Sequence, residues 1–113
     1  PLLVRKLHTI IRETGAHVVL SSTWRLDEWS RKAVQEQVVH FIDRTPFLGT
    51  PRWQEIQDWL NQAERGITKS VCLDDNSDCE IPNRPDYLFI QTDENTGLDD
   101  EDVERAIEFL GRQ

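Results

Sequence analysis

The chain has 113 residues, enough for one domain with a modest hydrophobic core and too few for a second. Thirteen basic against 21 acidic residues give a net charge of −8, which argues against a protein that acts mainly through non-specific contact with nucleic-acid phosphates. No apolar run approaches the ~18 residues of a membrane span, and no signal-peptide pattern opens the chain.

The two cysteines, Cys72 and Cys79, have the spacing of neither a disulfide framework nor a zinc motif. We therefore expect both thiols to be reduced. Reduced thiols favour a cytoplasmic location, and the lack of an apolar span gives no reason to expect a membrane partner.

Helical spacing of apolar residues predicts a first helix that ends at Gly15. The stretch HVVLSSTW follows, and its apolar residues 18–20 predict a strand covered by helices on both faces. This strand ends in three hydroxyls, at positions 21–23. Residues 27–38 predict a second helix, whereas VVHFI at 38–42 fits either an edge strand or a helix end.

After a loop, RWQEIQDWLNQAERG predicts a helix at 52–66. VCLDD then predicts a buried strand at 71–73 that runs directly into Asp74 and Asp75. Trp29, Trp53 and Trp59 are expected to pack in the core, and Trp24, directly after the hydroxyls, fits either the core or a wall of the pocket.

YLFIQ predicts a strand at 87–91, a turn follows at 95–97, and DDEDVERAIEFLG predicts a last helix whose acidic first turn complements its dipole. This alternation of helices and strands predicts an α/β chain with a largely parallel sheet and right-handed crossovers. In such sheets the chemistry gathers beyond the carboxyl ends of the strands. The hydroxyls at 21–23 and the acidic pair at 74–75 both follow strands, so we expect them to meet.

The acidic pair and the hydroxyls suit one kind of chemistry. Adjacent carboxylates repel each other and resist burial, so stability alone rarely places them after a buried strand. Magnesium can hold them ionised, because it commonly takes one or two carboxylates together with waters and phosphate oxygens. Hydroxyls at a neighbouring strand end can bind one phosphate oxygen, and Arg52 can neutralise another. These residue types together indicate a phosphoryl-transfer site.

Each candidate also has a purely structural interpretation. The hydroxyls can cap the following helix, Arg52 can be a surface residue at a helix N-terminus, and the acidic pair can form an ordinary turn. Arg25, Arg31 and Lys32 fit a solvated helix face, although Arg25 is near enough to Ser22 in the sequence to contact a substrate phosphate.

Four motifs in order, VVLSSTWR, PRWQEIQDWL, VCLDDNSD and TGLDDEDVERAIEFL, resemble the haloacid dehalogenase-like (HAD) hydrolase superfamily. The branch they resemble most is the HAD domain of Swiss Army Knife RNA repair proteins. The resemblance covers nearly the whole chain. It implies one HAD-like domain over residues 1–113, with a three-layer Rossmann-like fold and a mostly parallel sheet.

The resemblance also implies roles for individual residues. The strand-end hydroxyl that binds phosphate corresponds to Ser22, with Ser21 as the alternative register, and the conserved basic residue of the family corresponds to Arg52. The acidic pair corresponds to Asp74 and Asp75, at least one of which ligates Mg²⁺, the implied cofactor.

The sequence departs from the family pattern at the first motif, an Asp-x-Asp after an apolar strand near the N-terminus. Asp27, Asp43 and Asp58 follow no suitable strand, so the nucleophile of HAD phosphatases has no counterpart here. The strand that carries this motif lies at the centre of a HAD sheet, between the strands predicted at 17–21 and 70–74. We therefore expect these two strands to stand about 9 to 10 Å apart rather than to pair directly. An upstream segment or a second chain would complete the sheet.

Two functions follow from this pattern. The first is a magnesium-dependent phosphohydrolase domain or fragment that acts on a phosphate ester and is inactive without the missing nucleophile. The alternative is a non-catalytic module that binds a phosphate, a nucleotide or a protein partner. The enzyme assignment therefore stays open, and the substrate is a phosphorylated molecule of unknown class, with nucleic-acid ends suggested by the family alone.

Overall fold

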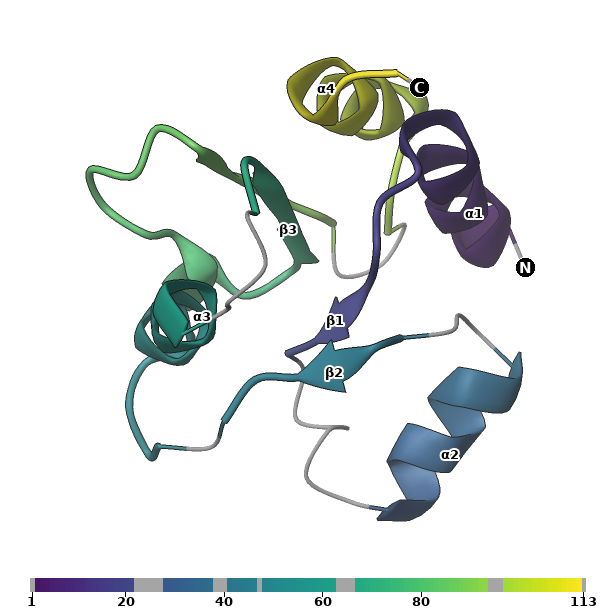
Figure 1. The fold of residues 1–113 in the computed structure, drawn as a ribbon. Helices are drawn as coiled ribbons and strands as arrows, with labels where there is room; N and C mark the ends of the chain where they lie inside the picture. The colour runs from purple at the N-terminus through teal and green to yellow at the C-terminus, as the bar shows by residue number, and fades with distance from the viewer. Residues whose placement is uncertain are drawn as a thin grey trace.

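The computed structural model describes residues 2–21, 28–37, 41–46, 48–62, 67–93 and 97–112 (Figure 1). Its elements, in chain order, are α1 (Leu2–Thr14), β1 (Val19–Leu20), α2 (Glu28–Gln37), β2 (Asp43–Arg44), α3 (Arg52–Gln62), β3 (Ser70–Asp74), the 3₁₀ turn η2 (Ser77–Cys79), β4 (Tyr87–Gln91) and α4 (Asp100–Leu110). Helices that alternate with short parallel strands confirm the α/β prediction. Within these ranges, no helix combines the length and the apolar character needed to cross a bilayer.

The described strands form two separate parallel ladders. In the first, Val19 of β1 stands opposite Asp43 of β2. In the second, β3 and β4 pair along their whole length, from Ser70 opposite Tyr87 to Asp74 opposite Gln91. No ladder joins β1 to β3, so the prediction that these two strands do not pair directly is confirmed.

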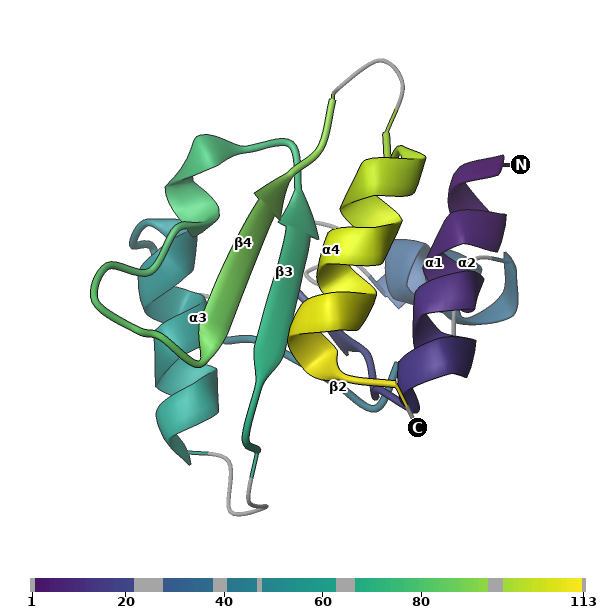
Figure 2. The same cartoon turned by 90° about the horizontal axis from the view of Figure 1, so that it is seen from above.

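Side chains of the β3–β4 ladder alternate between two cores, one on each face. Figure 2 shows α4 on one face of the ladder and α3 on the other, with α1 beside α4. The core under α4 is apolar, and its buried members are Ile10, Ile90, Leu98, Val103, Ala106 and Ile107. Val71 and Leu73 of β3 and Leu88 of β4 pack against it. This face supplies the burial that holds α1 and α4 to the ladder.

The second core lies under α3 and is smaller. Its buried members are Ile56, Cys79, Ile81 and Tyr87, and Trp53, Leu60, Cys72 and Phe89 pack against it. Strand alternation therefore points Cys72, and after it Asp74, toward α3, because residues two apart share a face. This alternation is what brings the end of β3 to the start of α3.

The start of α4 is closed by a capping box. The Asp99 side chain accepts a hydrogen bond from the Asp102 backbone N–H at 2.7 Å, and the Asp102 side chain accepts one from the Asp99 N–H at 3.2 Å. Three carboxylates occupy the first turn, where the helix dipole favours negative charge. The predicted acidic first turn is confirmed. Of the turn predicted just before it, at 95–97, only Gly97 lies within the described residues, with φ +71°.

One side chain of α2, that of Gln35, binds the segment that leads into β2. The Gln35 amide donates to the Phe41 carbonyl at 2.9 Å and accepts from the Phe41 N–H at 3.2 Å, so it imitates a strand partner. In the undecided stretch 38–42, residues 38–40 lie outside the described ranges and residues 41–42 belong to neither a strand nor a helix. A two-residue strand begins directly after it, at Asp43.

One tryptophan prediction is wrong. Trp29 on α2 is 81% exposed, because Val34 supplies the buried contact of that short helix. Trp53 packs against the core under α3, as expected. Trp59 is half-buried, and its indole N–H donates to the Asp43 carboxylate at 2.8 Å, whereas Trp24 lies outside the described residues.

Candidate functional site

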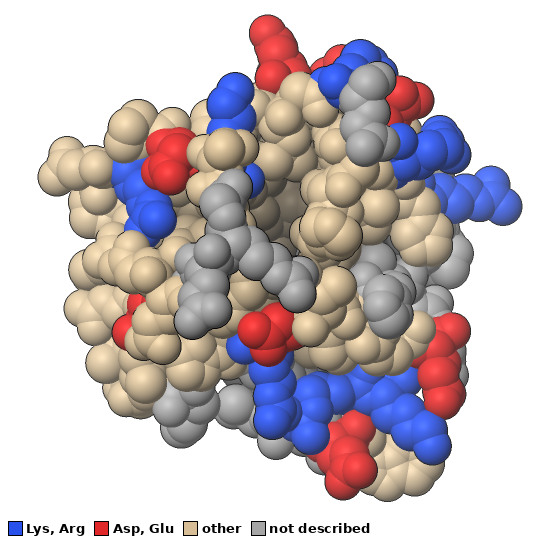
Figure 3. Space-filling model, viewed as in Figure 1, with Lys and Arg blue, Asp and Glu red and all other residues tan. Residues whose placement is uncertain are grey.

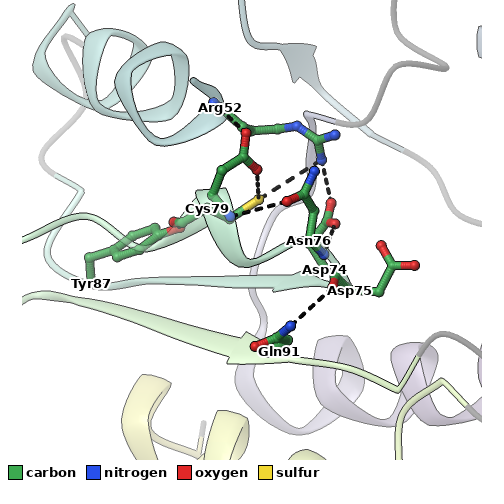
Figure 4. A network of polar contacts seen from close by, with 8 residues as sticks. Arg52, Asp74, Asp75, Asn76, Cys79, Tyr87 and Gln91 are labelled. Atoms are coloured by element: carbon green, nitrogen blue, oxygen red, sulfur yellow. Dashed lines mark hydrogen bonds and ion pairs between the residues drawn. The ribbon is translucent and has the colours of Figure 1, made fainter. Parts of the chain in front are cut away.

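An ion pair between Arg52 and Asp74 joins the first residue of α3 to the last residue of β3 (Figure 4). The Nη1 atom of Arg52 contacts Oδ2 of Asp74, and the two side chains are 14% and 13% exposed. The two residues are 22 positions apart in the sequence and meet because β3 ends where α3 begins. Both were predicted as site residues, and the structure brings them into direct contact.

The other oxygen of Asp74 orders the loop that follows β3. Its Oδ1 atom accepts a hydrogen bond from the Asn76 backbone N–H at 2.8 Å. The Asn76 side chain in turn accepts from the Asp78 N–H at 3.1 Å and so caps the turn η2. Both carboxylate oxygens of Asp74 are thus engaged within the protein.

Asp78 is a third acidic residue of the site, and the sequence-based argument missed it. Its Oδ2 atom accepts from the backbone N–H of Arg52 at 3.2 Å, so it supplies the carboxylate that a helix N-terminus favours. The sequence did carry one signal, the Asn76-Ser77-Asp78 stretch. An Asn side chain typically forms a turn by hydrogen-bonding the backbone two residues later.

Asp75 has a different environment from its neighbour. Its side chain is exposed and points away from Arg52 (Figure 4). Its backbone carbonyl accepts from the Gln91 side chain at 3.2 Å. The cavity at this end of the ladder has a volume of about 430 Å³ and is lined by Asp75, Gln91, Thr92 and Asp93. Another shallow cavity, of about 480 Å³, lies elsewhere, under α2.

The environment of Arg52 keeps its guanidinium protonated. Burial of its guanidinium opposes the charged form, but Asp74, Cys79 and Asp78 outweigh that effect and leave the pKa of Arg52 above its ordinary value. The group is therefore a permanent cation at the carboxyl end of β3. A cation of this kind can bind a phosphate oxygen as well as a carboxylate.

Three titratable groups lie beneath this ion pair. A hydrogen bond with the Cys79 thiol lowers the pKa of Cys72, although burial acts in the opposite direction. The same hydrogen bond, with burial, raises the pKa of Cys79, and burial chiefly raises the pKa of Tyr87. The Tyr87 hydroxyl donates to the Cys79 carbonyl at 2.6 Å and fixes the end of η2 on β4.

The oxygen donors at this site suit a magnesium ion whose other ligands are waters. Asp75 and Asp93 line one cavity, whereas Asp74, the residue before Asp75, has both carboxylate oxygens already engaged. Within the described part of the chain, no group of three or more His, Cys, Asp or Glu side chains gathers to hold a metal. One or two carboxylates plus waters is the set that magnesium commonly takes, so these residues suit it better than a metal that needs an all-protein cage.

Of the hydroxyls predicted to face this site, only Ser21 lies within the described residues, at the end of the other ladder. Ser21 directly follows β1 and is half-buried. Ser22, the preferred phosphate-binding residue, lies outside the described residues, as does Arg25. The meeting of the hydroxyls with Arg52 and Asp74 therefore stays a prediction.

Basic side chains gather in a second place, over α2 and β2. Figure 3 shows them at the lower right, where Figure 1 places these two elements. Arg31, Lys32 and Arg44 line the cavity of about 480 Å³ there, together with Glu28 and Asp43. Arg31 and Lys32 were predicted to form a solvated helix face, and the structure adds Arg44 beside them.

Comparisons with known proteins agree with the motifs. Residues 1–103 match the family described as the HAD domain in Swiss Army Knife RNA repair proteins. No curated protein and no solved structure gave a match. A phosphohydrolase-type function is what this family suggests. Because the match covers most of its 113 residues, the chain belongs to the family of HAD domains found in Swiss Army Knife RNA repair proteins.

Proposed function

We propose that the carboxyl end of β3 is the phosphate and magnesium site of a HAD-type phosphohydrolase acting on a phosphate ester. The observation that carries the proposal is the contrast between the two adjacent carboxylates. Asp74 holds the Arg52 guanidinium in place, whereas Asp75 is exposed and lines a cavity together with Asp93. A fixed cation beside an exposed carboxylate is an arrangement that can take a phosphate and a divalent cation together.

Arg52 is the residue assigned to phosphate positioning. A guanidinium carries five N–H donors, and its described contacts with Asp74 and Cys79 use Nη1. The donors on its other nitrogens can therefore bind a phosphate oxygen without breaking the ion pair. Ser22, or Ser21 in the alternative register, is assigned to a second phosphate oxygen.

Asp75 is assigned as the main metal ligand, with Asp74 beside it. Magnesium, when bound, would neutralise charge on the phosphate and favour one orientation of it. The exposed Asp75 can take up the ion without losing an internal contact, whereas Asp74 would have to share an oxygen with Arg52 or Asn76. This ranking refines the expectation that at least one of the two carboxylates ligates the ion.

The nucleophile is assigned to a strand outside this sequence. None of the residues in the Arg52–Asp74 network is suited to attack phosphorus, because each is engaged in positioning a neighbour. The edges of β1 and β3 that do not face their own partners offer backbone donors and acceptors to a strand inserted between them. A strand bearing the family's Asp-x-Asp motif would restore the complete Rossmann-like sheet there.

The second candidate function is a non-catalytic phosphate-binding module. The observation that favours it is the engagement of both Asp74 oxygens, which leaves Arg52 as a preformed anion site that needs no metal. The two functions differ in how phosphate binding depends on magnesium. In a phosphohydrolase site, bound cation and bound phosphate should strengthen each other. In a simple anion site they should not.

A calorimetric titration with inorganic phosphate, with and without Mg²⁺, separates the two. The proposed enzyme site predicts tighter phosphate binding in the presence of Mg²⁺, with the gain abolished in Asp75→Asn and all binding weakened in Arg52→Gln. The binding module predicts an effect of Arg52→Gln alone. Glu108→Gln, an exposed carboxylate on α4, is the matched control and should change nothing. Phosphate binding that is indifferent to Arg52→Gln would contradict both functions.

A further inference from the structure

Two free thiols lie in the same small core beneath the ion pair. Cys72 on β3 and Cys79 at the end of η2 are both unbridged, and Cys72 packs against the buried cluster that contains Cys79. The turn η2 itself packs against β3. They are seven positions apart in the sequence, and the chain between them folds back through the capped turn η2.

The two thiols differ in exposure. The Cys79 side chain is completely buried, whereas Cys72 is partly exposed. A small oxidant would therefore reach Cys72 first, and Cys79 would lie behind it in the same core. This order, an accessible sulfur backed by a buried one, is what allows a thiol pair to react in two steps rather than to stop at an adduct.

We propose that Cys72 and Cys79 form a reversible disulfide when the protein meets a low-molecular-weight disulfide such as oxidised glutathione. The Cys72 sulfur attacks one sulfur of the reagent, and the other leaves as a thiol that carries the proton lost by Cys72. The Cys79 sulfur then attacks Cys72, loses its own proton and releases the second reagent thiol. The protein gains one S–S bond, and the reagent is reduced to two thiols.

Closing this bond should disturb the phosphate site. The sulfurs must approach to about 2 Å, which draws η2 toward β3. Asp78 precedes Cys79 directly, and its carboxylate accepts from the Arg52 N–H and lies 3.9 Å from the Cys79 sulfur. The Arg52 guanidinium itself lies 3.9 Å from that sulfur. A shift of η2 would therefore move the Asp78 carboxylate, which binds the backbone of Arg52, and the Cys79 sulfur, which contacts the Arg52 guanidinium.

The disulfide itself is independent of the proposed function, whereas its effect on the site rests on that function. For the site, we expect oxidation to weaken inorganic phosphate binding roughly tenfold, about the effect of losing one charge-assisted hydrogen bond. The disulfide thus gives the site a sensitivity to redox conditions.

The test is intact-mass spectrometry of the folded protein after incubation with oxidised glutathione. The proposal predicts a monomer that has lost two hydrogen atoms, carries no glutathione and regains its mass with dithiothreitol. Digestion on the amino side of Asp74, Asp75 and Asp78 separates the two cysteines, so their peptides should remain joined until reduction. A stable glutathione adduct on the wild type, a covalent dimer or an unmodified chain would each overturn the proposal.

Two variants sharpen the result. Cys79→Ser should stop at a glutathione adduct on Cys72, because the second attack is removed. Cys72→Ser should stay unmodified, because Cys79 is buried. If either variant fails to fold, the mass of the wild type still decides. Phosphate titration of the reduced and oxidised wild type completes the test: absence of binding in both forms would count against the proposed function, and an unbridged protein that binds phosphate would count against the disulfide alone.

Discussion

At the scale of single residues, two identical neighbours have opposite environments. Asp74 is 13% exposed and paired with a permanent cation, and Asp75 faces solvent. The sequence predicted that Arg52 and Asp74 would share a site, because a strand end and the start of a crossover helix meet at one edge of a parallel sheet. It could not assign Asp78, whose contact with Arg52 spans 26 positions and depends on how the loop after β3 folds. Nor could it rank Asp74 against Asp75, since both follow the same apolar run.

This difference predicts unequal effects on stability. Asp74→Asn should lower the free energy of unfolding by about 2 to 3 kcal/mol, because it leaves the mostly buried Arg52 guanidinium without its charged partner. Asp75→Asn is the matched control and should leave unfolding in urea almost unchanged. Equal urea midpoints for the two variants would contradict the assignment of Asp74 as the partner of Arg52.

At the scale of elements, pattern and capping predicted most of the boundaries. The strand at 87–91 and the last helix are found as expected, since alternation and an acidic first turn are local signals. The stretch at 38–42 was left undecided and the short strand β2 after it was not predicted, because two residues are too few for a periodic pattern and the approach to β2 is fixed by the Gln35 side chain. Trp29 was misplaced for a related reason: a lone aromatic residue on a short polar helix carries no information about which face is buried.

The capping box of α4 gives a prediction at this scale. Asp99→Ala should destabilise the protein by about 1 kcal/mol, because it removes the acceptor of the Asp102 N–H. Thermal unfolding followed by circular dichroism measures the loss. Asp100→Ala, one position on and almost fully exposed, should have a smaller effect. A reversed ranking of the two variants would show that the box contributes little.

At the scale of the whole molecule, the described strands form two parallel ladders that do not pair with each other. Alternation along β3 and β4 divides the core into two parts and aims the end of β3 at α3. The sequence predicted the separation of β1 from β3 only through the family resemblance, since no local pattern specifies which strands are neighbours. The same resemblance places the nucleophile on a strand between them.

From this organisation we expect the 113 residues alone to show no hydrolysis of a generic aryl phosphate. Ser22 and Arg52 are assigned to orient the phosphoryl group, and neither is expected to attack it. A colorimetric phosphatase assay with Mg²⁺ tests this directly. Magnesium-dependent turnover that survives Asp75→Asn would mean that the chemistry has been assigned to the wrong residues.

The central claim is that the end of β3 binds magnesium through Asp75. A titration of ¹⁵N-labelled protein with Mg²⁺, followed by NMR of the backbone amides, tests it without any substitution. The account predicts saturable shifts concentrated at the residues that line the cavity, namely Asp75, Gln91, Thr92 and Asp93, with little change in the amides of α2. Shifts that fail to saturate, or that concentrate away from these residues, would contradict it.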